Sequence, residues 1–207
     1  MKQLYPHWPE TLNLDLARQS AEKIGIQWIS ELAFESPALL HTIQEKAKAL
    51  YAKGKLSKRE LWLGSYYRQE LQSSHFPDVR LSWIDSEIGW VVFANRNLKK
   101  GEWIGEYCGL VRKRRKRDRL NAYCFEYRLS EETTTKYLID AEHKGSLARF
   151  INHSSHPNLI TDLLFCGNLP HVILTVKEPV AKDEQLLYDY GPDYWSHQGK
   201  PLTLAPR

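Results

Sequence analysis

From about residue 79 onward, the sequence is a series of short strand-like runs separated by turn residues. The runs are Arg80–Ile84, Trp90–Ala94, Trp103–Cys108, Tyr123–Leu129, Tyr137–Asp140, Leu159–Cys166, His171–Val176 and Gln185–Tyr190. Turn-forming residues such as Gly101, Gly145 and Gly167-Asn168 lie between most of them. The runs do not alternate with helical segments, which argues against a doubly wound parallel sheet. The pattern predicts a mainly β fold.

The chain before residue 79 is predicted to be helical, with three amphipathic segments. The first begins at the N-cap Asn13 and has these apolar residues at helical spacing: Leu14, Ala17, Ala21, Ile24, Trp28 and Leu32. The second begins at Ser36-Pro37 and ends at Gly54. The third opens with the capping box Ser57-Lys58-Arg59-Glu60. We expect residues 1–78 to serve in packing, dimerisation or substrate selection.

The bulk composition is that of a soluble globular protein. Hydrophobic residues make up 42% of the 207 and charged residues 26%, and no run approaches the roughly 18 apolar residues that span a bilayer. No apolar stretch follows the N-terminal residues, so a secretory signal peptide is not expected. That leaves the cytosol, or export by a signal that is not recognisable here. The isolated Cys108, Cys124 and Cys166 support neither a disulfide framework nor a zinc cluster.

The positive charge is concentrated in one segment, Arg112–Arg119, which we call the basic tract. It holds seven cationic residues and one acid, so it contributes +6 to a net charge of +4. The rest of the chain is therefore slightly acidic, at about −2. The basic tract is typical of a nucleic-acid or nucleosome contact, of a nuclear-import signal, or of a solvated surface loop.

A polar cluster lies in the segment Arg149–Asn158. Asn152 offers amide donors and an acceptor, and His153 adds a ring beside them. Such a pair can bind a small polar ligand, or it can cap the local backbone of a loop. Taken alone, the segment leaves both alternatives open.

Three motifs in fixed order decide between them. They are Gly89-Trp90 with Glu106-Tyr107-Cys108-Gly109, then Asp140-Ala141 with Arg149-Phe150 and Asn152-His153-Ser154, and finally Glu184–Gly191 with its Tyr188-Asp189-Tyr190. This ordered set resembles the SET-domain protein lysine methyltransferases over roughly residues 80–195. The resemblance implies several small curled β-sheets with a C-terminal pseudoknot. It also implies S-adenosyl-L-methionine as cofactor, a SET domain at residues 79–195 and a short tail at 196–207.

The resemblance also assigns site residues. The cofactor-binding residues that it implies are Gly89, Trp90, Tyr123, Arg149, Asn152 and His153. Gly89 and Trp90 would act through backbone groups, and His153 mainly through its own backbone. Arg149 would shape the pocket, or else form a salt bridge to a neighbouring acid.

Three tyrosines match the catalytic positions of the family. Tyr190 matches the tyrosine near the transferred methyl group, and Tyr107 a wall of the lysine channel. Tyr188 matches the position at which Tyr or Phe sets how many methyl groups fit, so mono- or dimethylation is expected. Only neutral lysine has the lone pair for this transfer, but free lysine, with a pKa of about 10.4, is charged at neutral pH. An aromatic channel disfavours the ammonium by desolvation, so the chemistry needs alignment more than a strong base.

The sequence departs from the family pattern in two places. Glu87 and Val91 stand where many members have glycine, so the first cofactor loop is expected to be stiffer. Ser155 replaces a zinc-ligating cysteine, and no cysteine follows Tyr190. No metal is therefore expected, and the lid would come from Pro192–Trp195 and the tail, with Trp195 either a cover or a core anchor.

The predicted substrate is a histone or histone-like basic DNA-binding protein. Without cysteine-rich flanks, and with a compact helical N-terminal module, the chain resembles the small stand-alone members found in some bacteria. That resemblance implies a protein of the bacterial cytoplasm, or one exported to a host cell nucleus. The basic tract would repel a cationic peptide, so the peptide is expected along the near-neutral body. A catalytically silent SET module that binds chromatin or a protein partner is the alternative, and the N-terminal helices are a candidate homodimer interface.

Overall fold

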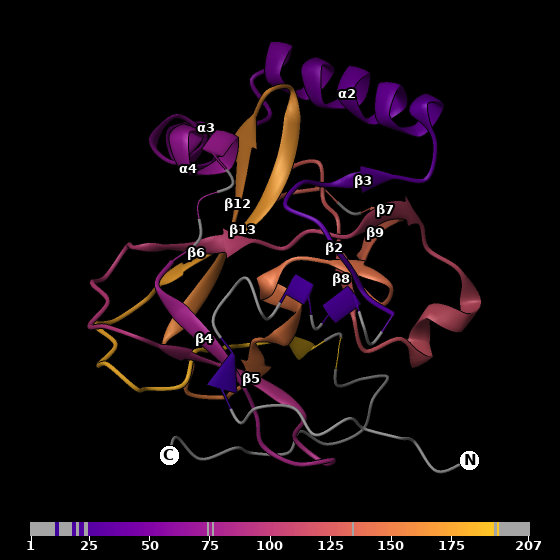
Figure 1. The fold of residues 1–207 in the computed structure, drawn as a ribbon. Coiled ribbons are helices and arrows are strands. Elements are labelled where there is room, and N and C mark those ends of the chain that lie inside the picture. Colours follow the sequence, from indigo (N-terminus) through magenta and orange to yellow (C-terminus); the bar gives the residue numbers. More distant parts are fainter. Residues whose placement is uncertain are drawn as a thin grey trace.

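The computed structural model of the chain describes residues 11–12, 18–19, 21–22, 25–73, 75, 77–133, 135–192 and 194. The described strands form several small sheets, with helices gathered at one end (Figure 1). The mainly β architecture expected from the strand pattern is therefore confirmed. No helix among the described residues is both long and apolar enough to cross a membrane.

Three sheets carry most of the fold. One has the order β1 (Thr11–Leu12), β4 (Val79–Trp83), β5 (Trp90–Ala94). The next has the order β3 (Ala33–Phe34), β7 (Leu110–Lys113), β9 (Tyr137–Asp140), β8 (Cys124–Glu126). The last has the order β12 (Leu159–Cys166), β13 (Leu169–Val176), β6 (Trp103–Glu106). The short 3₁₀ helix η1 (Lys116–Leu120) lies between β7 and β8, and η2 (Leu147–Phe150) precedes the Asn152-His153 pair.

The two later N-terminal helices begin where the capping signals predict. In α2 (Pro37–Ala52) the Ser36 hydroxyl accepts the Leu39 N–H, and in α3 (Lys58–Tyr66) Ser57 and Glu60 form the complete capping box. A short α4 (Arg68–Ser73) follows. These helices pack beside the β12–β13 hairpin (Figure 1). The contact is close: a Cβ on Gly64 would lie 1.9 Å from the Phe165 carbonyl oxygen, so glycine is required there.

The first predicted helix is wrong at its C-terminal end. Arg18, Gln19, Ala21 and Glu22 are helical, whereas Asn13, Leu14, Ala17 and Ile24 lie outside the described residues. Beyond Gly25, at φ +80°, the chain is extended, and β2 (Gln27–Trp28) pairs in parallel with β10 (Lys144–Gly145). An apolar residue is needed at position 28 because the Trp28 ring stacks on Phe150, at 6.2 Å between centroids. It does not lie on a helix face.

Strands from the first 78 residues pair with strands from the rest of the chain. β3 pairs in parallel with β7, and β1 pairs with β4. Ile43 of α2 is fully buried in the same hydrophobic cluster as the strands of the β-rich part. The predicted boundary at residue 79 remains a prediction, but the two sides of it share one core.

A parallel pairing near the C-terminal end positions the site. β11 (Asn152–His153) lies in register with β14 (Leu187–Tyr188), more than thirty residues later in the chain. The Asn158 side chain reinforces the crossing, since its Nδ2 donates to the Gln185 carbonyl at 2.8 Å and its Oδ1 accepts the Leu187 N–H at 2.9 Å. The polar cluster and the Tyr188–Tyr190 motif are thus brought side by side.

Candidate active site

A cluster of tyrosines follows directly from the β11–β14 pairing. The rings of Tyr188 and Tyr190 lie 4.7 Å apart between centroids, and Tyr194 meets Tyr190 edge-on at the same distance. Tyr107 packs against Phe125 of β8 at 5.1 Å. The predicted catalytic residues Tyr107 and Tyr188 are buried, and Tyr190 packs against the same core.

The hydroxyl groups of this cluster are held by backbone oxygens. The Tyr190 hydroxyl donates to the Ile151 carbonyl at 2.9 Å, and the Tyr107 hydroxyl donates to the Tyr123 carbonyl at 3.0 Å. Burial raises the pKa of the Tyr107, Tyr188 and Tyr190 phenols above the ordinary value. These hydroxyls therefore stay protonated at neutral pH and can act as fixed dipoles, but not as bases.

Arg149 is held between aromatic rings and backbone carbonyls. Its guanidinium lies over the Tyr123 ring at 4.2 Å and over the Phe150 ring at 4.7 Å. Its Nε donates to the Ala141 carbonyl at 2.8 Å, and its Nη2 reaches the Glu142 carbonyl at 3.4 Å. No acidic side chain of the described chain forms a salt bridge with it. The expected salt bridge is thus absent among the described residues, and the shaping role remains a prediction.

His153 has a function that the sequence did not reveal. Its Nδ1 accepts the Tyr190 backbone N–H at 3.2 Å, so the ring positions the tyrosine directly. The Asp189 carboxylate lies 3.5 Å from the same nitrogen, which favours a charged ring. Burial acts against this and is the larger effect, so the pKa of His153 is lowered. A neutral ring also fits the observed bond, since Nδ1 must be unprotonated to accept it.

The Gly89-Trp90 turn lies at the start of β5. Gly89 adopts φ +77°, a conformation that favours glycine, and a Cβ there would meet only the Trp83 ring at 4.0 Å. Val91, which replaces a family glycine, is buried in the core, and Glu87 is exposed. β5 is joined to the segment leading into Tyr188, because the Leu186 N–H donates to the Val92 carbonyl at 2.8 Å.

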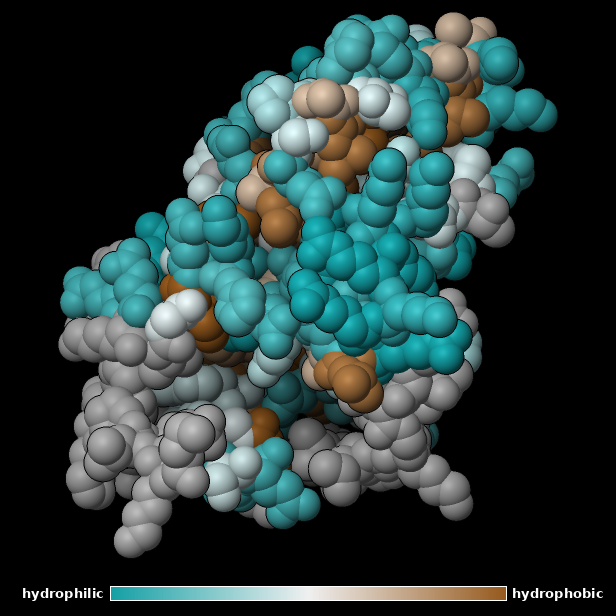
Figure 2. Space-filling model, turned by 90° about the vertical axis from the view of Figure 1, so that its right-hand side faces the viewer, coloured by the Kyte–Doolittle hydropathy of each residue, from teal (hydrophilic) through white to brown (hydrophobic). Residues whose placement is uncertain are grey.

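A cleft of about 760 Å³ ends at the tyrosine cluster. Tyr190, Gly191 and Tyr194 line one end, and Phe125 of β8 lines its wall. β8 is the edge strand of its sheet among the described residues. Four cations of the basic tract border the cleft: Arg114, Arg115, Lys116 and Arg119. Figure 2 looks onto this side of the molecule, where hydrophilic side chains form a broad band beside a hollow.

The family can be assigned from these observations and from one comparison. Residues 89–191 match the family model described as SET domain. The chain belongs to the SET-domain family. It is 37% identical over 109 residues to the histone-lysine N-methyltransferase Set8 of Drosophila melanogaster, covering 48% of this chain and 16% of that protein. The N-lysine methyltransferase KMT5A-A of Xenopus laevis is also 37% identical over 109 residues, covering 48% of this chain and 32% of that protein.

A solved structure shares the SET fold. A ctPRC2 in an autoinhibited conformation bound to S-adenosylmethionine superimposes with a TM-score of 0.50 at 21% identity, covering 59% of this chain and 16% of that one. The chain spans a third or less of the length of these relatives. The likeness is therefore to their SET domains, and not to the whole proteins.

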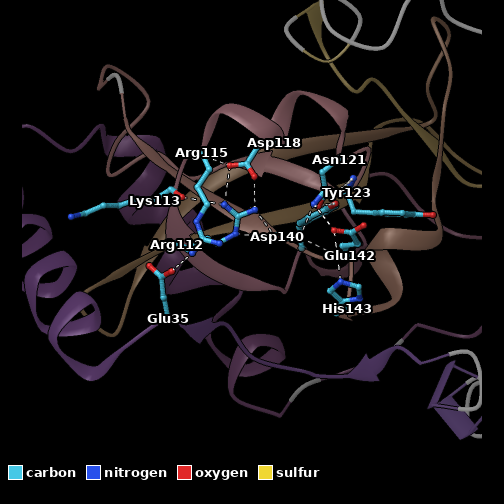
Figure 3. A network of polar contacts seen from close by, with 11 residues as sticks. Glu35, Arg112, Lys113, Arg115, Asp118, Asn121, Tyr123, Asp140, Glu142 and His143 are labelled. Atoms are coloured by element: carbon cyan, nitrogen blue, oxygen red, sulfur yellow. Dashed lines mark hydrogen bonds and ion pairs between the residues drawn. The ribbon is translucent and has the colours of Figure 1, made fainter.

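The basic tract of this SET domain is not exposed along its whole length. Arg112 lies in β7 and is only 5% exposed. Its guanidinium donates to both Asp118 oxygens, at 2.7 and 2.8 Å, and to Asp140 Oδ2 at 2.7 and 3.0 Å (Figure 3). Asp118, the one acid within the tract, is the only local signal that could have indicated this network.

The same network reaches the site. Asn121 donates from Nδ2 to Asp140 Oδ1 at 3.0 Å, and its Oδ1 accepts the Tyr123 N–H at 2.8 Å (Figure 3). The Tyr123 carbonyl in turn holds the Tyr107 hydroxyl. Hydrogen bonds thus connect Arg112 in the basic tract with Tyr107 in the predicted lysine channel.

The segment expected to form a lid, Pro192–Trp195 and the tail, is described only in part. Tyr194 packs on Tyr190, whereas Asp193, Trp195 and the tail to Arg207 lie outside the described residues. Ser155, at the position of the family's zinc ligand, is exposed, and its Oγ lies 3.1 Å from His156 Nδ1. Among the described residues, no group of three or more His, Cys, Asp or Glu side chains is placed to hold a metal ion.

Proposed function

We propose that this SET domain is an S-adenosyl-L-methionine-dependent protein lysine N-methyltransferase. The observation that carries the proposal is the buried tyrosine cluster at the end of the cleft. Tyr107, Tyr188 and Tyr190 come from two distant segments, and two of their hydroxyls are fixed on backbone carbonyls. The names of the relatives, histone-lysine and N-lysine methyltransferases, support the same activity.

The residues present fit the cofactor. The Asn152 carboxamide is half-buried and has no hydrogen-bond partner within the described chain, so it is available to a polar ligand. The backbone at Gly89 is open to close approach. The residues that would hold the cofactor are Gly89, Trp90, Tyr123, Arg149, Asn152 and His153. When bound, it supplies an electrophilic methyl group on a sulfonium centre.

The chain's own side chains would favour the neutral form of the substrate lysine and align it, without a strong base. Phe125, Tyr190 and Tyr194 line the end of the cleft with aromatic surface, which disfavours an ammonium by desolvation. The proton would leave to water through the cleft. The hydroxyl protons of Tyr107 and Tyr190 point at the Tyr123 and Ile151 carbonyls. The hydroxyl oxygens would then accept N–H groups of the amine and leave its lone pair free for the methyl group.

The geometry also supports a basic protein tail as substrate. The free edge of β8 borders the cleft, and an extended peptide can add to such an edge. The carboxylates that line the cleft are Asp118, Glu126, Glu131, Asp162 and Asp189. Three of them already pair with arginines, so Glu131 and Asp189 would meet cationic neighbours of the target lysine. We therefore propose a histone or histone-like protein. The basic tract borders the same cleft. The peptide path that the sequence predicts, along the near-neutral body, remains a prediction.

Tyr188 is proposed to limit the product to mono- or dimethyl-lysine. Its ring is buried against Tyr190, so its hydroxyl leaves little room beside a methylated nitrogen. Tyr188→Phe should shift the product toward higher methylation after exhaustive turnover, as measured by mass spectrometry. Tyr66→Phe, an exposed tyrosine on α3, should leave the product unchanged. Abundant trimethyl-lysine from the unaltered protein would contradict the assignment.

The alternative is a catalytically silent SET module, which titration calorimetry with S-adenosyl-L-methionine separates from an enzyme. The enzyme must bind the cofactor, and Asn152→Ala should weaken binding by about tenfold, the value of roughly one hydrogen bond. Gln72→Ala, an exposed amide on α4, is the matched control. If the unaltered protein shows no heat of binding, the enzyme proposal fails.

We also keep a homodimer through the N-terminal helices as a proposal. Tyr51, Trp62 and Tyr66 are 58%, 57% and 59% exposed on α2 and α3, which leaves aromatic surface for a second copy. The helices also pack on the β12–β13 hairpin of their own chain, so dimerisation is not needed to bury their inner faces.

A further inference from the structure

We infer that the exposed cations of the basic tract bind the phosphate backbone of nucleic acid, and that the preferred substrate is a basic protein already bound to that nucleic acid. The contact itself stands on the geometry of the tract. Its consequence for substrate choice rests on the proposed methyltransferase activity. The surface consists of Lys113, Arg114, Lys116 and Arg117, all exposed.

The tract is held in a defined shape rather than extended as a loop. Arg112 turns inward and is neutralised by Asp118 and Asp140. Asp118 also accepts the Arg115 N–H at the start of η1, so one acid fixes both the turn and the buried arginine (Figure 3). Arg115 pairs with Glu35, which ties the tract to the segment after β3. Arg112 is therefore a structural tie and not a ligand contact.

The remaining cations are left for an external anion. Among the described residues, no carboxylate lies within salt-bridge distance of Lys113, Arg114, Lys116 or Arg117. These four neighbouring positive charges repel one another, and a polyanion would neutralise them. Release of the counterions condensed on the polyanion would drive the binding further.

The composition of the tract favours nucleic acid over an acidic protein. Protein partners are usually anchored by buried aromatic or aliphatic side chains, and this tract has no aromatic residue. Binding to phosphates, in contrast, can be supplied by Lys and Arg charge alone. A uniform row of cations on a fixed turn meets that requirement.

The position of the tract links this contact to the candidate active site. Arg114, Lys116 and Arg119 border the same cleft that ends at Tyr190. A free cationic tail would be repelled there, whereas a bound phosphate backbone would neutralise the border. A basic protein on the same nucleic acid would then present its tail beside the cleft. Phosphate binding by the tract would thus favour substrates that are bound to nucleic acid over free ones.

The test measures binding of the full chain to a short fluorescent DNA duplex of random sequence, by anisotropy at several salt concentrations. The test variant carries Arg114→Gln, Lys116→Gln and Arg117→Gln. The control carries Lys53→Gln, Lys55→Gln and Lys58→Gln, three exposed lysines elsewhere with the same charge change. If each removed cation contacts one phosphate, the slope of log K against log salt should fall by about 2.7 in the test variant alone.

A second measurement compares methyl transfer to one basic protein, free and on DNA. The rate on DNA divided by the rate with the free protein should exceed one for the unaltered chain and for the control. In the tract variant this ratio should fall to one. Equal DNA binding by both variants would overturn the proposal, as would tract-dependent binding of polyglutamate without binding of DNA. If no methyl transfer occurs while DNA binding depends on the tract, the contact stands and the proposed activity fails.

Discussion

Replacing Tyr190 by phenylalanine is expected to lower kcat for methyl transfer by roughly 100-fold, the usual loss when one preorganised hydroxyl or amide donor is removed from a reacting centre. The Tyr190 hydroxyl is held at 2.9 Å by the Ile151 carbonyl, so its direction is set before substrate arrives. The ring remains in Tyr190→Phe, and its packing on Tyr188 and Tyr194 is kept. Cofactor affinity should therefore change little, and the loss should appear in kcat.

The measurement is a radiolabelled methyl-transfer assay against core histones and basic nucleoid proteins. Tyr66→Phe makes the same chemical change at a side chain that is 59% exposed, and should keep full activity. Circular dichroism of both variants checks that they fold. Activity of Tyr190→Phe within threefold of the unaltered protein would remove Tyr190 from the proposed catalytic group.

Replacing Arg112 by alanine is expected to lower the free energy of unfolding by about 3–5 kcal/mol, the usual cost of removing one partner from a buried ion pair. Asp118 and Asp140 would be left with 7% and 15% of their side chains exposed and without their cation. Urea unfolding at neutral pH measures this. Arg117→Ala, an exposed member of the same tract, should change stability by about 0.5 kcal/mol or less.

The effect of Arg112 should also depend on pH. Its guanidinium lowers the pKa of the Asp118 carboxyl below the ordinary value, mainly through their hydrogen bonds. A carboxyl with a lowered folded-state pKa stabilises the fold above its unfolded pKa of about 3.9, and loses this contribution as the pH falls through the folded value. The stability difference between the unaltered protein and Arg112→Ala should thus be full at neutral pH and narrow in acid. A difference independent of pH would contradict the network.

Local signals predicted the helices that begin at Ser36 and Ser57, because each cap satisfies backbone groups within its own turn. They failed at Gln27–Trp28, where Trp28 lies at helical spacing but belongs to a strand. There the partner strand, Lys144–Gly145, comes from far along the chain and overrides the local pattern.

The sequence by itself determined the family, since three motifs can be recognised by their order and spacing alone: Gly89-Trp90, Asn152-His153 and Tyr188-Asp189-Tyr190. The tertiary structure alone decided that the His153 ring holds the Tyr190 backbone, and that Arg112 turns inward to Asp118 and Asp140. The physical reason is that both depend on burial and on partners placed by chain crossings. A sequence records which side chains can ionise or hydrogen-bond, but only the fold sets the distances and solvent exclusion that determine which of them do.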